Sequence, residues 1–227
     1  MTVHSATLPV LFLDLDDTIV NSSAAYNHGM HAIGIEPNDL DYLRAREQTK
    51  CLLPKLAPQS HSRFLYFKTY LENRGEYTPA LHLSMAYEYE AAVLNFLEDN
   101  WNFLNRESLF LKLRTLYSFI HILTNEMTRI QVHKLRVLDP NFMLFDRVTT
   151  SEDVGFEKPD HSIFNHALQV SNVKPSQVIM VGDSFDNDIR PALELGIKPI
   201  LTTEFSGSTK LERGIAVIKS LEELLLF

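Results

Sequence analysis

The sequence predicts an α/β protein, with a Rossmann-like doubly wound parallel sheet as its core and an all-helical cap inserted after the first strand. Three observations lead to this fold class. Apolar runs and helical patterns alternate after about residue 104, which is typical of parallel strands covered by helices on both faces. A separate apolar run at 10–13 precedes a long stretch of helical periodicity that has few β-branched runs. We therefore expect an α/β core at 1–18 and 104–227 and a helical cap at 19–103.

The helical stretch is divided by proline and glycine into four or five expected helices. The breaks fall at Pro37, Pro54, Pro58, Gly75 and Pro79. Asp39 suits the N-cap of one helix, and Pro79 suits the first turn of another, where its missing N–H costs little. Two apolar stripes are expected to pack into the protein: Phe64, Phe67, Tyr70 and Leu71, and more loosely Leu83, Tyr87, Tyr89 and Phe96.

The second half of the chain alternates short elements in a regular order. We expect strands at 119–123, 147–149, 178–181, 199–201 and 215–218, because each run is apolar or β-branched. We expect helices at 106–118, 127–138, 161–170 and 186–195. In open α/β sheets ligands bind at the carboxyl ends of the strands, so the polar residues that follow the strands are the candidates for a site.

Composition and charge narrow the class of protein. The chain has 227 residues, 45% of them hydrophobic, and no repeat of fixed period, so we expect an ordered globular fold. Cys51 is the only cysteine, which excludes an intrachain disulfide. A net charge of −8 disfavours nucleic-acid polymers as partners, although a local cation or metal still permits a small anionic substrate. Neither a secretory signal nor a membrane span is evident, so we expect a cytoplasmic protein, a monomer with a dimer as the alternative.

The strongest functional signal is the run Asp14, Leu15, Asp16, Asp17 and Thr18, which directly follows the first apolar strand. A buried strand would deliver these carboxylates to its carboxyl end. Because unpaired buried carboxylates are costly, a cation or a reacting group is expected beside them. Taken alone, the run is equally consistent with an ordinary acidic turn.

Three further polar clusters follow later strands. Thr124 and Asn125 offer a hydroxyl and backbone N–H groups to a phosphoryl oxygen, although the pair is also common turn and helix-cap chemistry. Lys158, before Pro159, offers a point charge, but such a lysine is usually a solvated loop residue. The run from Gly182 to Asp188 combines a glycine for a tight turn with clustered carboxylates that suit a hard ion such as magnesium.

In this order the four clusters resemble the motifs of the haloacid dehalogenase superfamily of phosphohydrolases. Those motifs are DxDxT, a Thr or Ser after the second strand, a Lys, and GDxxxxD. The match covers roughly 8–20 and 106–204, and the helical insertion matches in position and type. Within the superfamily the chain resembles the helical-cap class that contains pyrimidine 5'-nucleotidases and N-acylneuraminate-9-phosphatase-like enzymes.

The resemblance implies a role for each matching residue. Asp14 would be the nucleophile that forms an aspartyl phosphate. Asp16 would be the acid that protonates the leaving group and then the base that activates water. The Mg²⁺ cofactor would be held by Asp14, the backbone carbonyl of Asp16 and the carboxylate of Asp183, with Asp188 orienting a metal-bound water or the lysine.

The remaining matches would bind the phosphoryl group, and two residues depart from the pattern. Thr124, the N–H of Asn125 and Lys158 would share the negative charge of the transferring group. Glu126 stands where relatives often have glycine, and Asp186 makes the fourth motif unusually acidic. Glu126 would either crowd or repel an anionic substrate, or simply be an acidic residue favoured at a helix start.

The expected activity is Mg²⁺-dependent hydrolysis of a phosphomonoester of a small metabolite, a nucleotide monophosphate or a sugar phosphate. The presence of Asp16 disfavours a dehalogenase, because a halide leaving group needs no proton. A sugar phosphomutase of the same fold and a non-catalytic phospholigand-binding protein are the alternatives. Candidates to meet the leaving group are His28, Arg44, Arg46, Arg63 and Arg74, but the sequence favours a solvent-facing position for each and selects none of them.

Overall fold

Six strands form one parallel sheet in the order β3-β2-β1-β4-β5-β6. The computed structural model describes residues 8–206 and 214–227, so the parts of the expected core at 1–7 and 207–213 lie outside the described residues. The strands are β1 (Val10–Leu13), β2 (Phe119–Thr124), β3 (Arg147–Thr150), β4 (Val178–Gly182), β5 (Lys198–Thr202) and β6 (Ala216–Ile218). The strand order reverses between β1 and β4, which is where open α/β sheets form their ligand crevice.

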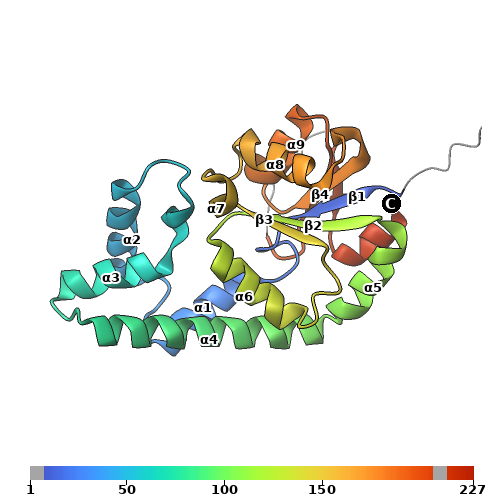
Figure 1. The fold of residues 1–227 in the computed structure, drawn as a ribbon. Helices are drawn as coiled ribbons and strands as arrows, with labels where there is room; N and C mark the ends of the chain where they lie inside the picture. Colours follow the sequence, from blue (N-terminus) through green and yellow to red (C-terminus); the bar gives the residue numbers. More distant parts are fainter. Residues whose placement is uncertain (1–7, 207–213) are drawn as a thin grey trace, which may run out of the picture.

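Helices cover both faces of this sheet. They are α5 (Arg106–Leu116), α6 (Thr128–Leu138), α7 (Ser151–Val154), α8 (His161–Ser171) and α9 (Arg190–Glu194). Along β1, Leu11 and Leu13 pack in the core with α5 and α6, whereas Val10 and Phe12 pack on the opposite face with α8 (Figure 1). A strand buried on both faces explains why β1 is a continuous apolar run. The predicted α/β fold class is confirmed.

The segment between β1 and β2 is helical, as expected. It contains α1 (Ser22–Ala32), α2 (Leu40–Leu52), a 3₁₀ turn (Pro58–His61), α3 (Arg63–Arg74) and α4 (Pro79–Phe103), which we call the helical segment. Asp39 caps α2 by accepting a 2.8 Å bond from the Tyr42 N–H, and Thr78 caps α4 at Pro79. Figure 1 shows α4 along the bottom of the view, from below α3 to below α6, with α1 and α6 drawn above it. The division into core and cap domains stays a prediction.

One predicted apolar stripe of the helical segment is partly correct, since Tyr89 is buried and Phe96 packs against the core, whereas the other two residues are exposed. Leu83 and Tyr87 are 42% and 57% exposed. The buried face of α4 consists instead of His82, Ala86, Tyr89, Val93, Leu97 and Trp101. Residues three and four apart share a helix face, so the stripe was misplaced because His82 is polar and was not counted. His82 is buried because its Nε2 lies 2.7 Å from the carbonyl oxygen of Phe64. In the other stripe Phe67, Tyr70 and Leu71 are buried as predicted, and Phe64 is exposed.

Most elements of the second half begin and end within two residues of their predicted bounds, with one clear exception. The helix expected at 186–195 is a π-helical turn, Phe185–Ile189, followed by the short helix α9. The π turn places Asp188 on the inner side of the loop after β4, where it is buried. Within the described residues, no helix is long and apolar enough to cross a membrane.

Candidate active site

Asp14 lies at the carboxyl end of β1 and makes an ion pair with Lys158. The Lys158 Nζ is 2.8 Å from Asp14 Oδ1, 2.6 Å from Asp188 Oδ1 and 3.0 Å from the Leu123 carbonyl oxygen. All three charged side chains are at least nine-tenths buried. The ammonium group therefore sits between two carboxylates from the two central strands, one following β1 and the other following β4.

Lys158 is held in place through its backbone as well as its side chain. The Asn125 side chain accepts a 2.7 Å bond from the Lys158 N–H and donates a 3.2 Å bond to the Lys158 carbonyl. With 3% exposure, Lys158 is not the solvated loop residue that its sequence context favoured. Burial lowers the pKa of Lys158, but the carboxylates of Asp14 and Asp188 outweigh burial and hold its pKa above the usual value. The lysine is thus a permanent cation.

Three carboxylates at this point form a candidate metal site. Carboxylate oxygens of Asp14, Asp183 and Asp188 lie within 4.8 Å of one another. Burial and repulsion from Asp188 and Asp183 raise the pKa of Asp14 to about 8, despite the opposing effect of Lys158. Burial and repulsion from Asp188 and Asp17 raise the pKa of Asp183 to about 7. A donor set of hard oxygen ligands that repel one another fits a divalent cation, which would restore their ionised form.

Gly182 is required here for close approach rather than for a tight turn. It is the last residue of β4, and a Cβ built on it would overlap the side-chain atoms of Asp188. The sequence analysis expects a glycine here because it allows a tight turn, and this reason is wrong. The absence of a side chain lets Asp188 fold back against the strand, where the Ser184 N–H donates to it at 3.1 Å.

Asp16 is bound by a set of polar side chains from two elements, α1 and α6. Lys134 Nζ lies 2.6 Å from Asp16 Oδ1, the Tyr26 hydroxyl donates to the same oxygen at 3.0 Å, and Gln131 Nε2 donates to Oδ2 at 2.7 Å. The Ser22 hydroxyl also donates to Asp16. Burial alone would raise the pKa of Asp16, but Lys134 and these hydrogen bonds outweigh it and hold the pKa below its usual range. Asp16 is consequently ionised in this arrangement.

Thr124 is the last residue of β2 and lies near Asp16. Its hydroxyl is 2.9 Å from Gln131 Nε2, so Gln131 links Thr124 to Asp16. A cavity of about 160 Å³ is lined by every predicted site residue: Asp14, Asp16, Thr124, Asn125, Lys158, Asp183 and Asp188. We call it the catalytic cavity. The extra carboxylate Asp186 does not line it and pairs instead with Arg190.

Contacts between the helical segment and the core close one side of this cavity. Arg63 Nη1 lies 2.9 Å from Glu126 Oε1, and His61 Nε2 lies 2.7 Å from Glu157 Oε2. Glu126 has a backbone φ of 100°, a conformation that favours glycine. Its side chain reaches Arg63 and does not act at a helix start, since α6 begins only at Thr128. The departure from the glycine pattern thus supplies a bridge to the helical segment.

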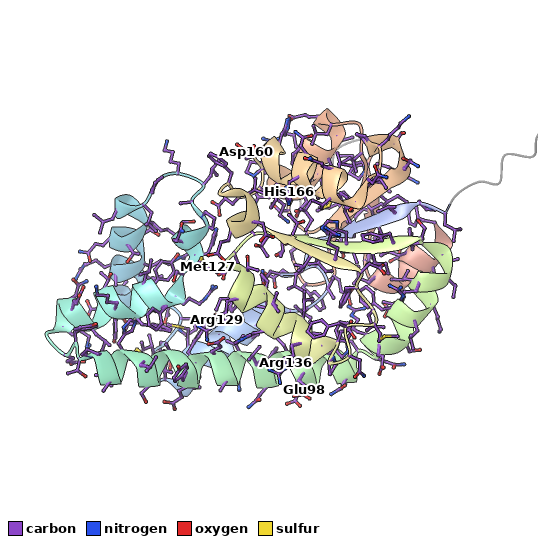
Figure 2. The ribbon with its side chains drawn as sticks, in the orientation of Figure 1. Glu98, Met127, Arg129, Arg136, Asp160 and His166 are labelled. Atoms are coloured by element: carbon purple, nitrogen blue, oxygen red, sulfur yellow. The ribbon has the colours of Figure 1, made fainter. Side chains whose placement is uncertain are left out.

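A second set of contacts lies along α6. Arg129, whose position near the start of α6 beside the helical segment is labelled in Figure 2, lies 3.6 Å from Glu90 of α4. His133 Nδ1 lies 3.0 Å from the same carboxylate. The helical segment is therefore joined to the core by contacts of α6 with α4 and by contacts of His61 and Arg63 beside the catalytic cavity.

Comparison with known proteins settles the family. The model of the haloacid dehalogenase-like hydrolase family matches residues 10–202, which include all four motifs and the helical segment. The chain belongs to this family. The predicted resemblance is confirmed, and the protein is a hydrolase of the phosphoric monoester phosphatase type.

Relatives of this haloacid dehalogenase-like hydrolase match it over most of its length or over about two thirds of it. The glyceraldehyde 3-phosphate phosphatase of Methanothermobacter thermautotrophicus is 29% identical over 208 residues, which are 91% of this chain and 89% of the relative. The ribulose-1,5-bisphosphate 5-phosphatase of Halopiger xanaduensis is 34% identical over 143 residues, 63% of this chain and 58% of the relative. Among solved structures, the HAD-hydrolase YfnB from Bacillus subtilis superposes with a TM-score of 0.67 at 21% identity, covering 96% and 97% of the two chains, which shows the shared fold.

Sequence reasoning did not identify Lys134, Gln131 or Tyr26 as part of the site. A signal for the first two was present in α6, whose buried face consists of Gln131, Lys134, Leu135 and Leu138. Two polar residues within an otherwise apolar stripe indicate a buried polar network, because an unpaired lysine would not be tolerated there. Tyr26 carries no comparable signal, since an aromatic residue on an amphipathic helix is usually part of a core.

Proposed function

We propose that this enzyme hydrolyses phosphomonoesters of small, sugar-like metabolites through an aspartyl-phosphate intermediate on Asp14. The observation that carries the proposal is the contact of Asp14 with Lys158, at 2.8 Å, beside two further carboxylates. The relatives named as phosphatases of glyceraldehyde 3-phosphate and of ribulose 1,5-bisphosphate favour a sugar phosphate over a nucleotide. The residues at 19–103 would act as a cap that selects the leaving group.

In the first step a carboxylate oxygen of Asp14 attacks phosphorus, and the bond from phosphorus to the ester oxygen breaks. Repulsion between the phosphate dianion and the carboxylate opposes this approach. Lys158 offsets that repulsion, because its ammonium group lies next to the Asp14 carboxylate. Asn125 holds the backbone of Lys158 in place. Thr124, at the end of β2, lies on the same cavity wall and can donate its hydroxyl to a phosphoryl oxygen.

Asp14 and Asp183, with Asp188 beside them, would hold a Mg²⁺ ion, and the Asp16 backbone carbonyl would complete the protein ligands. When bound, the ion supplies positive charge that draws the raised pKa values of Asp14 and Asp183 down and keeps the nucleophile ionised. The relative YfnB is described as bound to magnesium, which supports this choice of metal.

Asp16 would exchange protons with the leaving group and with water. In the first step it gives a proton to the departing alkoxide, and in the second it takes one from the water that attacks phosphorus and releases Asp14. Lys134 favours the ionised form of Asp16, which is the form needed for the second step. The first step needs the protonated form, so binding of substrate must weaken the contact between Asp16 and Lys134.

The proposal is tested with purified protein and p-nitrophenyl phosphate or glyceraldehyde 3-phosphate as substrates. Phosphate release should require Mg²⁺, stop on addition of EDTA and return when Mg²⁺ is restored. Asp14→Asn should abolish turnover, while Asp99→Asn, an exposed change in α4, should leave it unaltered. Acid quenching during turnover should leave one phosphoryl group on the peptide that contains Asp14. Turnover that survives in the Asp14→Asn protein would exclude Asp14 as the nucleophile.

A further inference from the structure

A second cavity adjoins the catalytic cavity on the side of the helical segment. It has a volume of about 280 Å³ and shares Tyr26, His61 and Arg63 with the catalytic cavity. Its other walls come from α1, α2 and α4, including Arg46 and Tyr89. We call it the helical-segment cavity. Because the two cavities share walls, a molecule whose phosphate lies beside Asp14 can extend its other end into this space.

The charges that line the two cavities are opposite in sign. The catalytic cavity is lined by the carboxylates of Asp14, Asp16, Glu126, Asp183 and Asp188. Among the described residues, no aspartate or glutamate lines the helical-segment cavity, whereas two arginines and a histidine do. This is unexpected in a protein with a net charge of −8, and it produces a local positive potential beside the reaction centre.

The two arginines differ in how they are held. Arg63 is fixed, because its guanidinium carbon lies 3.6 Å from the centre of the Tyr26 ring and its Nη1 binds Glu126. Arg46 is half-buried on α2, and within 8–206 and 214–227 no carboxylate lies within 4.0 Å of its guanidinium nitrogens. Its charge therefore has no carboxylate partner among these residues, although Arg46 lies close enough to the Tyr66 hydroxyl to lower the pKa of that group. A planar guanidinium in this situation is suited to binding a carboxylate or a phosphate with two parallel hydrogen bonds.

Tyr89 supplies independent evidence that the cavity receives a ligand. Its side chain is 7% exposed and lines the cavity from α4, yet its hydroxyl has no hydrogen-bond partner among the described residues. Burial raises the pKa of Tyr89, so the hydroxyl stays protonated and is a donor. An unsatisfied buried hydroxyl is costly and rare in folded proteins. Because the hydroxyl oxygen is almost fully enclosed, an acceptor oxygen on a bound molecule reaches it once the cavity wall around Tyr89 shifts.

We propose that the helical-segment cavity binds a second anionic group, a carboxylate or a phosphate, at the far end of the substrate. This inference rests on the proposed phosphatase function and narrows its substrate class to metabolites that carry two anionic groups. Arg46 and Arg63 bind the second group, and the Tyr89 hydroxyl donates to one of its oxygens. A substrate that ends in an alcohol or an aldehyde leaves the charge of Arg46 uncompensated.

Two pairs of substrates test this proposal and separate the two kinds of anion. Glucitol 6-phosphate and 6-phosphogluconate differ only at the terminal carbon, an alcohol against a carboxylate. Ribulose 5-phosphate and ribulose 1,5-bisphosphate differ by one phosphate. The doubly anionic member of at least one pair should have a kcat/KM higher by about tenfold or more, and that pair identifies the anion. A difference below about twofold in both pairs would overturn the proposal.

Variants of α2 and α4 show whether the preference comes from this cavity. Arg46→Gln and Tyr89→Phe should each reduce the preference, the former by about fivefold or more and mainly through KM. Arg46→Lys should restore part of it, because it keeps the charge. Arg44→Gln is the matched control, since Arg44 is exposed on the same helix beside Asp41. A preference that persists unchanged in Arg46→Gln contradicts the assignment.

Binding measured without turnover separates failure of this inference from failure of the proposed function. Asp14→Asn protein is titrated calorimetrically with both members of each pair. Tighter binding of the doubly anionic member, lost in the Asp14→Asn/Arg46→Gln double variant, supports the cavity even if wild-type protein hydrolyses nothing. Hydrolysis of p-nitrophenyl phosphate together with equal Kd values for both members of each pair retains the phosphatase and rejects the second anionic group.

Discussion

The catalytic cavity and the helical-segment cavity adjoin each other, yet they are built on different principles. In the catalytic cavity the ammonium group of Lys158 has carboxylate partners within the protein, because it lies between Asp14 and Asp188. Its side chains extend from strand ends and from the loops directly after them. In the helical-segment cavity Arg46 has no carboxylate partner among the described residues, and the Tyr89 hydroxyl has no acceptor. The protein itself thus positions the cation of the catalytic cavity, whereas the charge of Arg46 in the helical-segment cavity is available to a ligand.

Two glycines that allow close packing also differ between the two cavities. A Cβ on Gly182 would displace the Asp188 side chain, which belongs to the catalytic cavity. A Cβ on Gly29 of α1 would lie 2.7 Å from Val93 and 2.8 Å from the Tyr89 ring, where α1 packs on α4. In the core, close approach therefore positions a charge at the reaction centre. In the helical segment, close approach of α1 to α4 positions the Tyr89 ring, which lines the helical-segment cavity.

The largest effect is expected from Lys158→Met. Removal of the ammonium leaves the carboxylates of Asp14 and Asp188 facing each other and withdraws the charge that offsets the incoming phosphate. We expect kcat to fall by about 10²–10³-fold, the usual cost of removing one electrostatic donor from a preorganised site. Steady-state kinetics with p-nitrophenyl phosphate at saturating Mg²⁺ measure the change.

Lys112→Met, an exposed change in α5, is the control for Lys158→Met. It should leave kcat within about twofold of the wild-type value, as surface substitutions usually do. If Lys158→Met also changed kcat by less than about fivefold, Lys158 would not be the group that supports the reaction. The proposed contrast between Lys158, which is positioned by protein carboxylates, and Arg46, which has no carboxylate partner among the described residues, would then have no functional meaning.

The sequence predicts the catalytic cavity much better than it predicts the helical-segment cavity. Asp14, Lys158 and Asp183 each follow a strand or its adjoining loop, and parallel strands bring their carboxyl ends to one edge, so chain position alone brings them together. Arg46 and Tyr89 lie on different helices whose relative rotation depends on side-chain packing. Periodicity gives no rotation between helices, and for this reason the sequence could not choose Arg46 among the arginines of the segment.

Buried polar residues account for most of the errors. His82 and Lys134 are buried because each has a specific partner, the Phe64 carbonyl and Asp16 respectively, and the identity of a partner is a property of the tertiary structure. A pattern that counts only apolar residues does not include buried polar residues. The π-helical turn before α9 was missed for a related reason, since it follows from the fit of Asp188 against Gly182.

The next largest effect is expected from Lys134→Met, which removes the cation that binds Asp16 in the catalytic cavity. The substitution preserves side-chain volume but leaves the Asp16 carboxylate without its cation in a buried site. Breaking a buried ion pair from one side costs about 3–5 kcal/mol, so the free energy of unfolding at pH 7 should fall by about 3 kcal/mol. Urea denaturation followed by circular dichroism measures it.

The loss caused by Lys134→Met should depend on pH in a defined direction. Lys134 depresses the pKa of Asp16, so the ion pair contributes stability above the usual pKa of an aspartate, 3.8, and loses it as pH falls below that value. In the variant the pKa of Asp16 rises, and the carboxyl takes up a proton at mildly acidic pH. The difference in unfolding free energy should therefore be smaller at pH 4 than at pH 7. A difference that widens toward low pH would show that Lys134 does not act on Asp16.

The smallest effect is expected from a comparison of Glu126→Gly with Glu126→Ala. Both variants remove the carboxylate that binds Arg63, so the difference between them reports only the backbone at φ 100°. The glycine variant should be more stable by about 1 kcal/mol, because alanine rarely adopts this conformation. At Glu90, in the middle of α4, the same two substitutions should rank in the opposite order by a similar amount, since glycine is the poorer residue inside a helix. Thermal denaturation of the four variants measures both differences, and the same order at both positions would mean that the backbone at Glu126 is not strained.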